Sequence, residues 1–207
     1  MNRFAIFRSA IFAGICIGIA GFGFLADKTL GMFLFIFGLA TVVSYKLKLF
    51  TGTAGFVQSW SDMLDLLLIL VGNWLGCLLV GLAARCSAMP LQETALHLLE
   101  GRLALGPWKA GILSIGCGIL MTTSVTFARK SRDFGHWIPL LMAVPLFILC
   151  GFPHCIADAF YYLTVDFSWL ALHAGEVILL YGCLVVGNFI GCNLYRAFVC
   201  EDVVSAK

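Results

Sequence analysis

The chain of 207 residues is 61% hydrophobic and only 12% charged, and its mean hydropathy is +1.01. A soluble fold of this size would have too little polar material to cover its surface, so the composition indicates an integral membrane protein. The net charge of +2 is too small to favour nucleic-acid binding, and the length leaves no room for a sizeable soluble domain beside the membrane segments.

Six apolar segments are predicted to cross the bilayer. In chain order they cover about residues 9–26, 29–45, 64–84, 108–127, 136–163 and 175–199. Each is close to the ~20 residues that a helix needs to span a hydrocarbon core of roughly 30 Å. The connection from Arg85 to Pro107 is partly amphipathic and favours a short helix at the membrane surface. We therefore expect residues 1–207 to form a single all-α membrane domain.

A heptapeptide recurs near the end of each half of the chain. Residues 71–77 read Val-Gly-Asn-Trp-Leu-Gly-Cys, and residues 186–192 read Val-Gly-Asn-Phe-Ile-Gly-Cys. Each half contains three apolar segments, and an odd number means that the second copy enters the membrane in the opposite orientation. The pattern predicts a 3+3 inverted repeat, with repeat 1 at about 9–84 and repeat 2 at about 108–199. Inverted repeats of this kind normally build a transport pathway where the halves meet.

The middle segment of each half is interrupted at a similar place. Residues 44–55 mix lysines, glycines and hydroxyl side chains, and residues 150–158 include Pro153, which removes a backbone donor and clashes with the preceding turn. Interrupted backbone at membrane depth is tolerated only where protein or a water-filled cavity satisfies it. The two breaks therefore indicate the walls of a transport site.

His154 lies in the second break. A titratable side chain at membrane depth is by default a functional candidate, although a hydrogen-bonded core histidine is the alternative. His97, His136 and His173 lie in connections or at segment ends, and the nine cysteines form no CxxC or Cys/His pattern. We therefore expect neither a metal nor a cofactor.

The basic residues predict the orientation. With the N-terminus inside, Lys28, Arg85, Arg102 and Lys109 fall outside, whereas the inner side holds Arg3, Arg8, Arg129, Lys130, Arg132, Arg196 and Lys207. This excess of seven to four, which leaves aside Lys46 and Lys48, places both termini in the cytoplasm. We expect a multi-pass protein of the inner (cytoplasmic) membrane.

The combined motifs resemble those of the formate/nitrite transporter family. The chain has Leu-Phe-Thr-Gly at 49–52, Gly-Phe-Pro-His-Cys-Ile-Ala at 151–157 and Gly-Asn-Phe-Ile-Gly at 187–191, in the family's order. The resemblance extends over nearly the whole chain. It implies a homopentamer with an aquaporin-like protomer fold and broken second and fifth helices. Each protomer would then have its own pore for small monovalent anions such as formate, nitrite or hydrosulfide.

The same resemblance implies roles for individual residues. Thr51 and His154 should face each other midway through the pore, where a hydroxyl and an imidazole can hydrogen-bond a passing anion. Side chains at positions that narrow the family's pore are Phe35, Leu39, Leu49, Phe50 and Phe147. For Phe35 and Phe147, plain helix packing is an equally good interpretation. A desolvated weak-acid anion gains proton affinity, so it can take a proton that His154 donates or relays, or His154 can simply polarise the anion.

Four positions depart from the family pattern. Lys48 and Pro153 stand where the family has Glu, and Asp158 and Ile115 stand where it usually has Asn. We hypothesise that Lys48 and Asp158 form a replacement ion pair across the two breaks. The alternative is that Lys48 extends to the membrane interface.

Two other functional classes remain open. An aquaporin-like pore for neutral solutes shares the fold, but its Asn-Pro-Ala signature is missing. A membrane enzyme would need a second reactive group beside His154; its neighbour Cys155 is the only candidate, and adjacent residues of a helix point to different faces. We therefore expect a channel for small monovalent anions, with no enzymatic activity.

Overall fold

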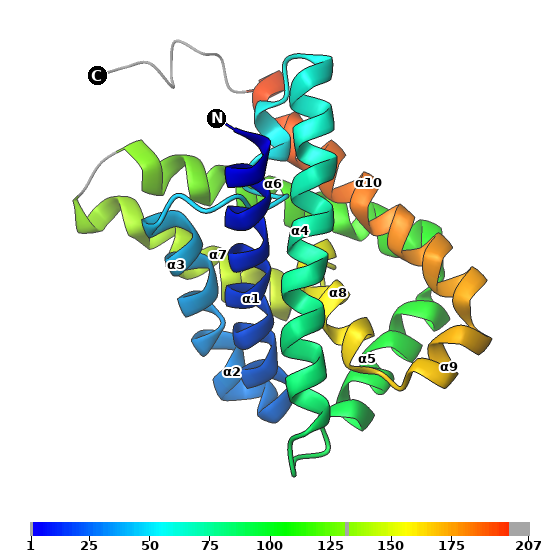
Figure 1. The fold of residues 1–207 in the computed structure, drawn as a ribbon. Coiled ribbons are helices and arrows are strands. Elements are labelled where there is room, and N and C mark those ends of the chain that lie inside the picture. Colours follow the sequence, from blue (N-terminus) through cyan, green and yellow to red (C-terminus); the bar gives the residue numbers. More distant parts are fainter. Residues whose placement is uncertain (1, 131–132, 199–207) are drawn as a thin grey trace.

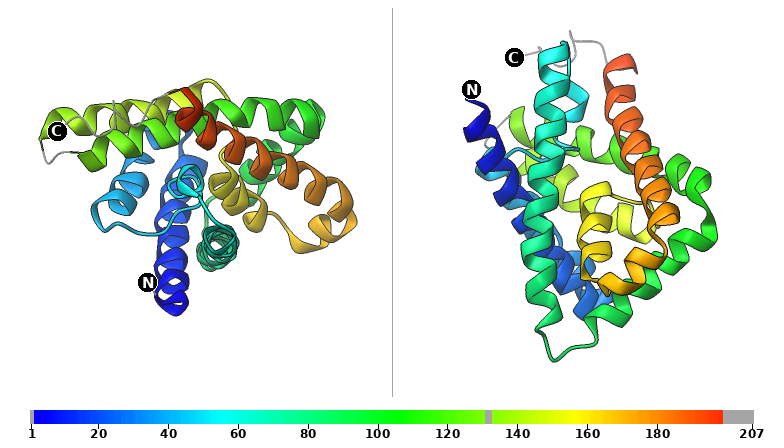
Figure 2. Two further views of the ribbon diagram at one scale, coloured as in Figure 1. Left: turned by 90° about the horizontal axis from the view of Figure 1, so that it is seen from above. Right: turned by 45° about the vertical axis from the view of Figure 1, so that its right-hand side comes forward.

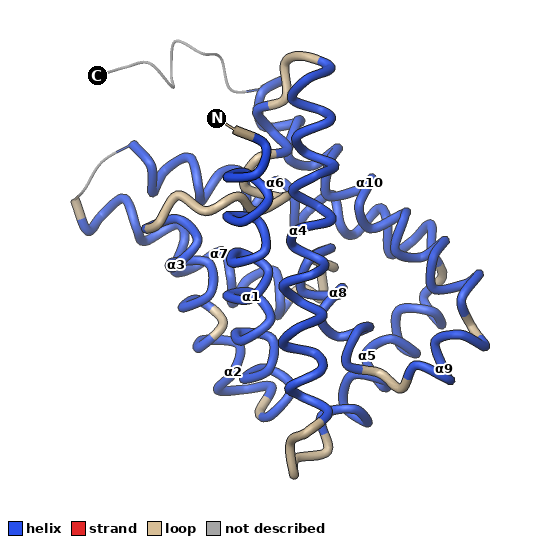
Figure 3. The backbone as a smooth tube through the Cα atoms, viewed as in Figure 1, coloured by secondary structure: helices blue, strands red, loops and turns tan. Residues whose placement is uncertain are grey.

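The structure is a computed structural model that describes residues 2–130 and 133–198. All regular elements in these ranges are helices (Figure 3). Figure 1 labels the α-helices, and two single 3₁₀ turns, η1 and η2, complete the set. The elements are α1 (Arg3–Ala26), α2 (Lys28–Leu34), α3 (Ile36–Ser44), η1 (Ala54–Phe56), α4 (Trp60–Arg85), α5 (Leu91–Leu105), α6 (Pro107–Lys130), η2 (Phe134–Trp137), α7 (Ile138–Leu149), α8 (Cys155–Thr164), α9 (Phe167–Leu172) and α10 (Ala174–Phe198).

Within the described residues, four helices are long and apolar enough to cross a membrane, namely α1, α4, α6 and α10. The two middle segments are composed of shorter apolar helices, Lys28–Ser44 and Ile138–Leu149. These are the segments in which the sequence predicts a break, and both breaks are present. After the second break the chain resumes as α8, whereas after the first it forms only η1 before α4 begins.

The long helices pack as two pairs, α1 with α4 and α6 with α10 (Figures 1 and 2). Glycines let the backbones of each pair approach closely. A Cβ atom placed on Gly14 of α1 would lie 2.8 Å from the Cα of Asn73 on α4. One placed on Gly118 of α6 would lie 2.8 Å from the backbone nitrogen of Cys192 on α10. The recurrent heptapeptide thus lies at the equivalent helix crossing in each half.

Capping explains why two helices begin earlier than the hydropathy pattern predicts. The side chain of Asn2 accepts a hydrogen bond from the Phe4 N–H at 3.0 Å, so α1 begins at Arg3. Ser59 and Asp62 form a capping box that begins α4 at Trp60. Helix α9, which the sequence pattern does not predict, has no buried side chain.

Helix α5 is the surface helix that the sequence predicts between the two halves. Its buried residues Leu91, Ala95 and Leu99 follow a four-residue spacing, and they pack on the core while the opposite face stays exposed. In Figure 1, α5 and α9 lie at the lower end of the molecule, whereas α1 begins and α10 ends at the upper end. The orientation count includes Arg132 and Lys207, and the last predicted span ends at Val199. These three residues lie outside the described residues.

Close packing of the first pair is testable with two glycines of the same helix. We expect Gly14→Ala to lower the stability of the purified protein by about 1–3 kcal/mol, because its methyl group overlaps the α4 backbone. Gly23→Ala is the control, since an added Cβ there meets no atom within 4 Å. Thermal unfolding in detergent measures both, and equal melting temperatures would contradict the packing assignment.

Candidate functional site

The first break is held by the amide side chain of Asn73. Its Oδ1 accepts the N–H of Phe50 at 2.9 Å, and its Nδ2 donates to the carbonyl oxygens of Lys48 at 2.9 Å and Ala10 at 2.8 Å. Asn73 is fully buried. It therefore supplies partners to backbone groups that the end of α3 leaves without helical hydrogen bonds.

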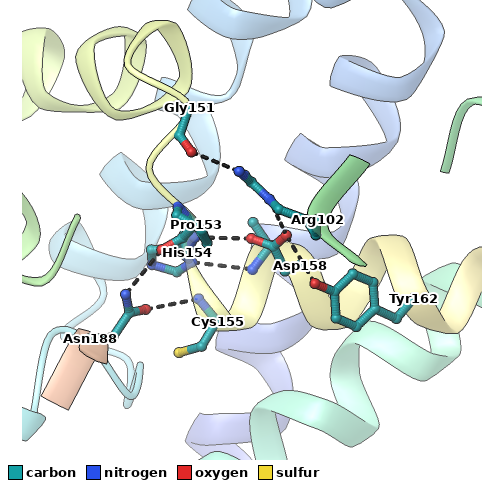
Figure 4. Close-up of polar contacts among 9 residues, drawn as sticks. Arg102, Gly151, Pro153, His154, Cys155, Asp158, Tyr162 and Asn188 are labelled. Atoms are coloured by element: carbon teal, nitrogen blue, oxygen red, sulfur yellow. Dashed lines mark hydrogen bonds and ion pairs between the residues drawn. The ribbon is translucent and has the colours of Figure 1, made fainter. Parts of the chain in front are cut away.

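Asn188 does the same at the second break (Figure 4). Its Oδ1 accepts the N–H of Cys155 at 2.8 Å, and its Nδ2 donates to the carbonyl oxygens of Pro153 at 3.0 Å and Ser114 at 2.8 Å. Each asparagine thus bonds two break residues separated by two positions and one carbonyl of the helix packed beside it. The sequence shows the two Gly-Asn pairs, but only the structure shows that the asparagine side chains hydrogen-bond the backbone of the breaks.

One cysteine thiol of each half donates a hydrogen bond to a backbone carbonyl in the break of the other half. Cys77, four residues after Asn73, donates to the carbonyl of Ile156 at 3.4 Å. Cys192, four residues after Asn188, donates to the carbonyl of Thr51 at 3.4 Å. These bonds place the two breaks against each other.

Thr51 and His154 are brought together where the breaks meet. The Thr51 Oγ1 and the His154 Nε2 are 3.0 Å apart, and the two residues are only 1% and 2% exposed. His154 is also the N-cap of α8, where its Nδ1 accepts the Ala157 N–H at 3.1 Å. Because Nδ1 accepts, the proton of the neutral imidazole lies on Nε2, which donates to the Thr51 hydroxyl oxygen.

Apolar side chains enclose this contact. The ring of Phe147 lies 5.7 Å from that of His154, and Phe35 meets Phe147 edge-on at 6.0 Å. The remaining residues expected to narrow a pore are also buried, namely Leu39, Leu49 and Phe50. Phe147 therefore lies beside His154 with Phe35 packed against it, and all five side chains are buried.

The expected ion pair between Lys48 and Asp158 is wrong. Asp158 pairs instead with Arg102 of α5, whose Nε lies 3.3 Å from Oδ1. The Nη1 of Arg102 donates to the Gly151 carbonyl at 2.7 Å (Figure 4). Lys48 is only half-buried, and its backbone bonds Asn73 and the Ser9 hydroxyl.

The orientation count places Arg102 on the outer side, in the connection between the two halves, and its side chain is only 22% exposed. A signal was present in the sequence. Arg102 follows Leu99 by three residues and therefore continues the buried face of α5. The carboxylate of Asp158 has three polar partners. Besides the bond from Arg102, its Oδ2 accepts the backbone N–H of His154 at 3.0 Å and its Oδ1 is 3.4 Å from the Tyr162 hydroxyl.

A cavity of about 340 Å³ leads from the α5 side toward the second break. Its wall carries the cationic side chains of Lys28 and Arg102, and it is also lined by His97, Phe147 and Asp158. At the other break, the Nη1 of Arg129 lies 3.5 Å from the Gly52 carbonyl. At each break, an arginine side chain therefore donates a hydrogen bond to a glycine carbonyl.

The model of the family described as "Formate/nitrite transporter" matches residues 1–200. The chain belongs to the formate/nitrite transporter family. It is thus a multi-pass protein of a membrane transporter family, as its four long apolar helices also indicate.

Solved structures show the same fold for this member of the formate/nitrite transporter family. It is similar to a "Pentameric formate channel with formate bound", with a TM-score of 0.80, 21% identity and coverage of 94% of each chain. It is also similar to an "FNT family ion channel", with a TM-score of 0.75 and 17% identity over 94% of this chain and 88% of that one. No curated protein matches the sequence.

The buried Arg102–Asp158 pair is testable by removing one partner or both. We expect Arg102→Gln to destabilise the protein by about 3 kcal/mol, because it leaves a buried carboxylate without its cation. Arg102→Gln with Asp158→Asn should recover most of that loss.

Arg3→Gln is the matched control, since the Arg3–Asp65 pair is exposed and such pairs contribute at most about 1 kcal/mol. Melting temperatures in detergent rank the three variants. If Arg102→Gln melts no lower than Arg3→Gln, the pair does not stabilise the break.

Proposed function

We propose that this protein is a channel for small monovalent weak-acid anions such as formate, nitrite or hydrosulfide, with the Thr51–His154 contact at the centre of its pathway. The observation that supports this most is the 3.0 Å contact between a hydroxyl and an imidazole that come from two different helix breaks. A pathway of this kind runs where the two halves of a transporter meet.

The hydrogen-bond directions at this contact favour an anion. The imidazole offers the Nε2 proton, and Thr51, which accepts that proton with its oxygen, keeps its own hydroxyl proton for another acceptor. An anion that enters between them meets two donors. A cation would meet no carboxylate there, because both oxygens of Asp158 are engaged by Arg102, Tyr162 and the His154 N–H.

The apolar enclosure determines the form in which the solute crosses. A charge stripped of water without replacement costs many kcal/mol, so the ring of Phe35, Leu39, Leu49, Phe50 and Phe147 excludes hydrated ions. An anion that enters this region gains proton affinity and crosses as the neutral acid. With Nδ1 held by the cap of α8, the neutral imidazole of His154 polarises the anion through its Nε2–H, and the proton that neutralises the anion comes from water.

The assembly and orientation are part of the same proposal. The equivalent bonds of Asn73 and Asn188 and the crossed thiol bonds support one channel domain arranged as a 3+3 inverted repeat. The pentameric formate channel among the similar structures supports a homopentamer. The excess of basic residues supports an inner-membrane protein with both termini in the cytoplasm.

Replacing the central histidine tests the pathway. We expect His154→Ala to reduce formate uptake into proteoliposomes by roughly tenfold or more and to change the pH dependence of uptake. The reason is that the Nε2–H donor, which would hydrogen-bond the anion, is lost. Uptake of radiolabelled formate at several pH values is the measurement, with quantities of reconstituted protein matched.

His173→Ala is the control, because His173 stacks on Trp169 at the end of α9, away from the breaks. We expect its uptake to equal that of the wild type. Formate uptake that is unchanged in His154→Ala would place the pathway elsewhere.

A further inference from the structure

We propose that Arg102 is a specificity-determining residue that selects planar oxyanions, such as formate and nitrite, over single-centre anions such as hydrosulfide. This inference rests on the proposed function, since it concerns which anion reaches the Thr51–His154 contact. It is carried by the position of a partly bound guanidinium on the wall of the cavity before that contact.

The donors of Arg102 are only partly used by the protein. A guanidinium has five N–H donors in a fixed fork. In the described part of the chain, its Nε bonds the Asp158 carboxylate and its Nη1 bonds the Gly151 carbonyl. The second Nη1 proton and both Nη2 protons are left for another acceptor. Figure 4 shows the guanidinium between these two partners, so its orientation is already fixed.

The guanidinium of Arg102 lies on the wall of the cavity that leads toward the second break. The side chain of Arg102 is 22% exposed and lines the cavity, whereas Asp158 at its back is only 3% exposed. The Asp158 oxygens are turned toward Arg102, Tyr162 and the His154 N–H. A solute in the cavity therefore meets the cationic group before the carboxylate.

The shape of the fork distinguishes among the candidate anions. Formate and nitrite each carry two oxygens in one plane, which match the two parallel N–H groups of a guanidinium end. Hydrosulfide offers a single acceptor atom and gains nothing from the second donor. Lys28, which also lines the cavity, attracts any anion and supplies no such fork.

Arg102→Lys tests this directly, because it keeps a cation for Asp158 and removes the planar fork. The measurement is the initial rate of iso-osmotic swelling of proteoliposomes in formate, nitrite and hydrosulfide, expressed as ratios within one preparation. We expect the formate-to-hydrosulfide and nitrite-to-hydrosulfide ratios to fall by roughly tenfold, the factor for losing a charge-assisted hydrogen bond. Lys28→Gln is the control, and it should slow all three anions without changing the ratios.

The outcomes separate this inference from the proposed function. If wild-type protein passes all three anions and the ratios are unchanged in Arg102→Lys, the selection by Arg102 is wrong while the channel stands. If the wild type passes none of them, the proposed function fails and the selection fails with it.

A measurement on the wild type does not depend on the variant folding. We expect formate and nitrite uptake to saturate at roughly tenfold lower concentrations than hydrosulfide uptake, because only the planar oxyanions gain a second bond at the cavity wall. Equal half-saturating concentrations would overturn the selection.

Discussion

The interrupted backbone of the two middle segments is the constraint on which the rest of the structure depends. A peptide group without a partner at membrane depth costs several kcal/mol, so a helix can be broken there only if other groups replace its hydrogen bonds. Asn73 and Asn188 provide that replacement, each with one accepted and two donated bonds. The glycines around them let the long helices approach closely enough for the amides to reach the breaks.

The polar centre follows from this arrangement. Because each asparagine holds a break in place and a thiol of each half bonds the opposite break, Thr51 and His154 are positioned from two different segments. Arg102 adds a restraint from outside the spans, since it ties α5 to Gly151 and Asp158. One set of bonds therefore builds the membrane fold, the central contact and the basic cavity that leads toward it.

Sequence reasoning could identify the breaks, because lysine, proline and histidine side chains are unusual within long apolar runs. The hydropathy pattern also predicted most of the helices, and family motifs related Thr51 to His154. It could not identify the partner of Asp158, since Lys48 and Arg102 carry the same charge and only the return of α5 over the second break decides between them. The asymmetry between α8 and the short turn η1 follows the residue pattern, because Gln58, Ser59, Ser61 and Asp62 follow the first break whereas the apolar run 159–163 follows the second.

In the proposed channel, weak-acid anions such as formate rather than neutral solutes such as urea enter between the two breaks. Stopped-flow light scattering of wild-type proteoliposomes in iso-osmotic formate and in iso-osmotic urea tests it most directly, with protein-free liposomes as the baseline. We expect formate to enter faster than the baseline and urea to enter no faster than the baseline. Entry of urea alone would contradict it and would assign the protein to the neutral-solute class.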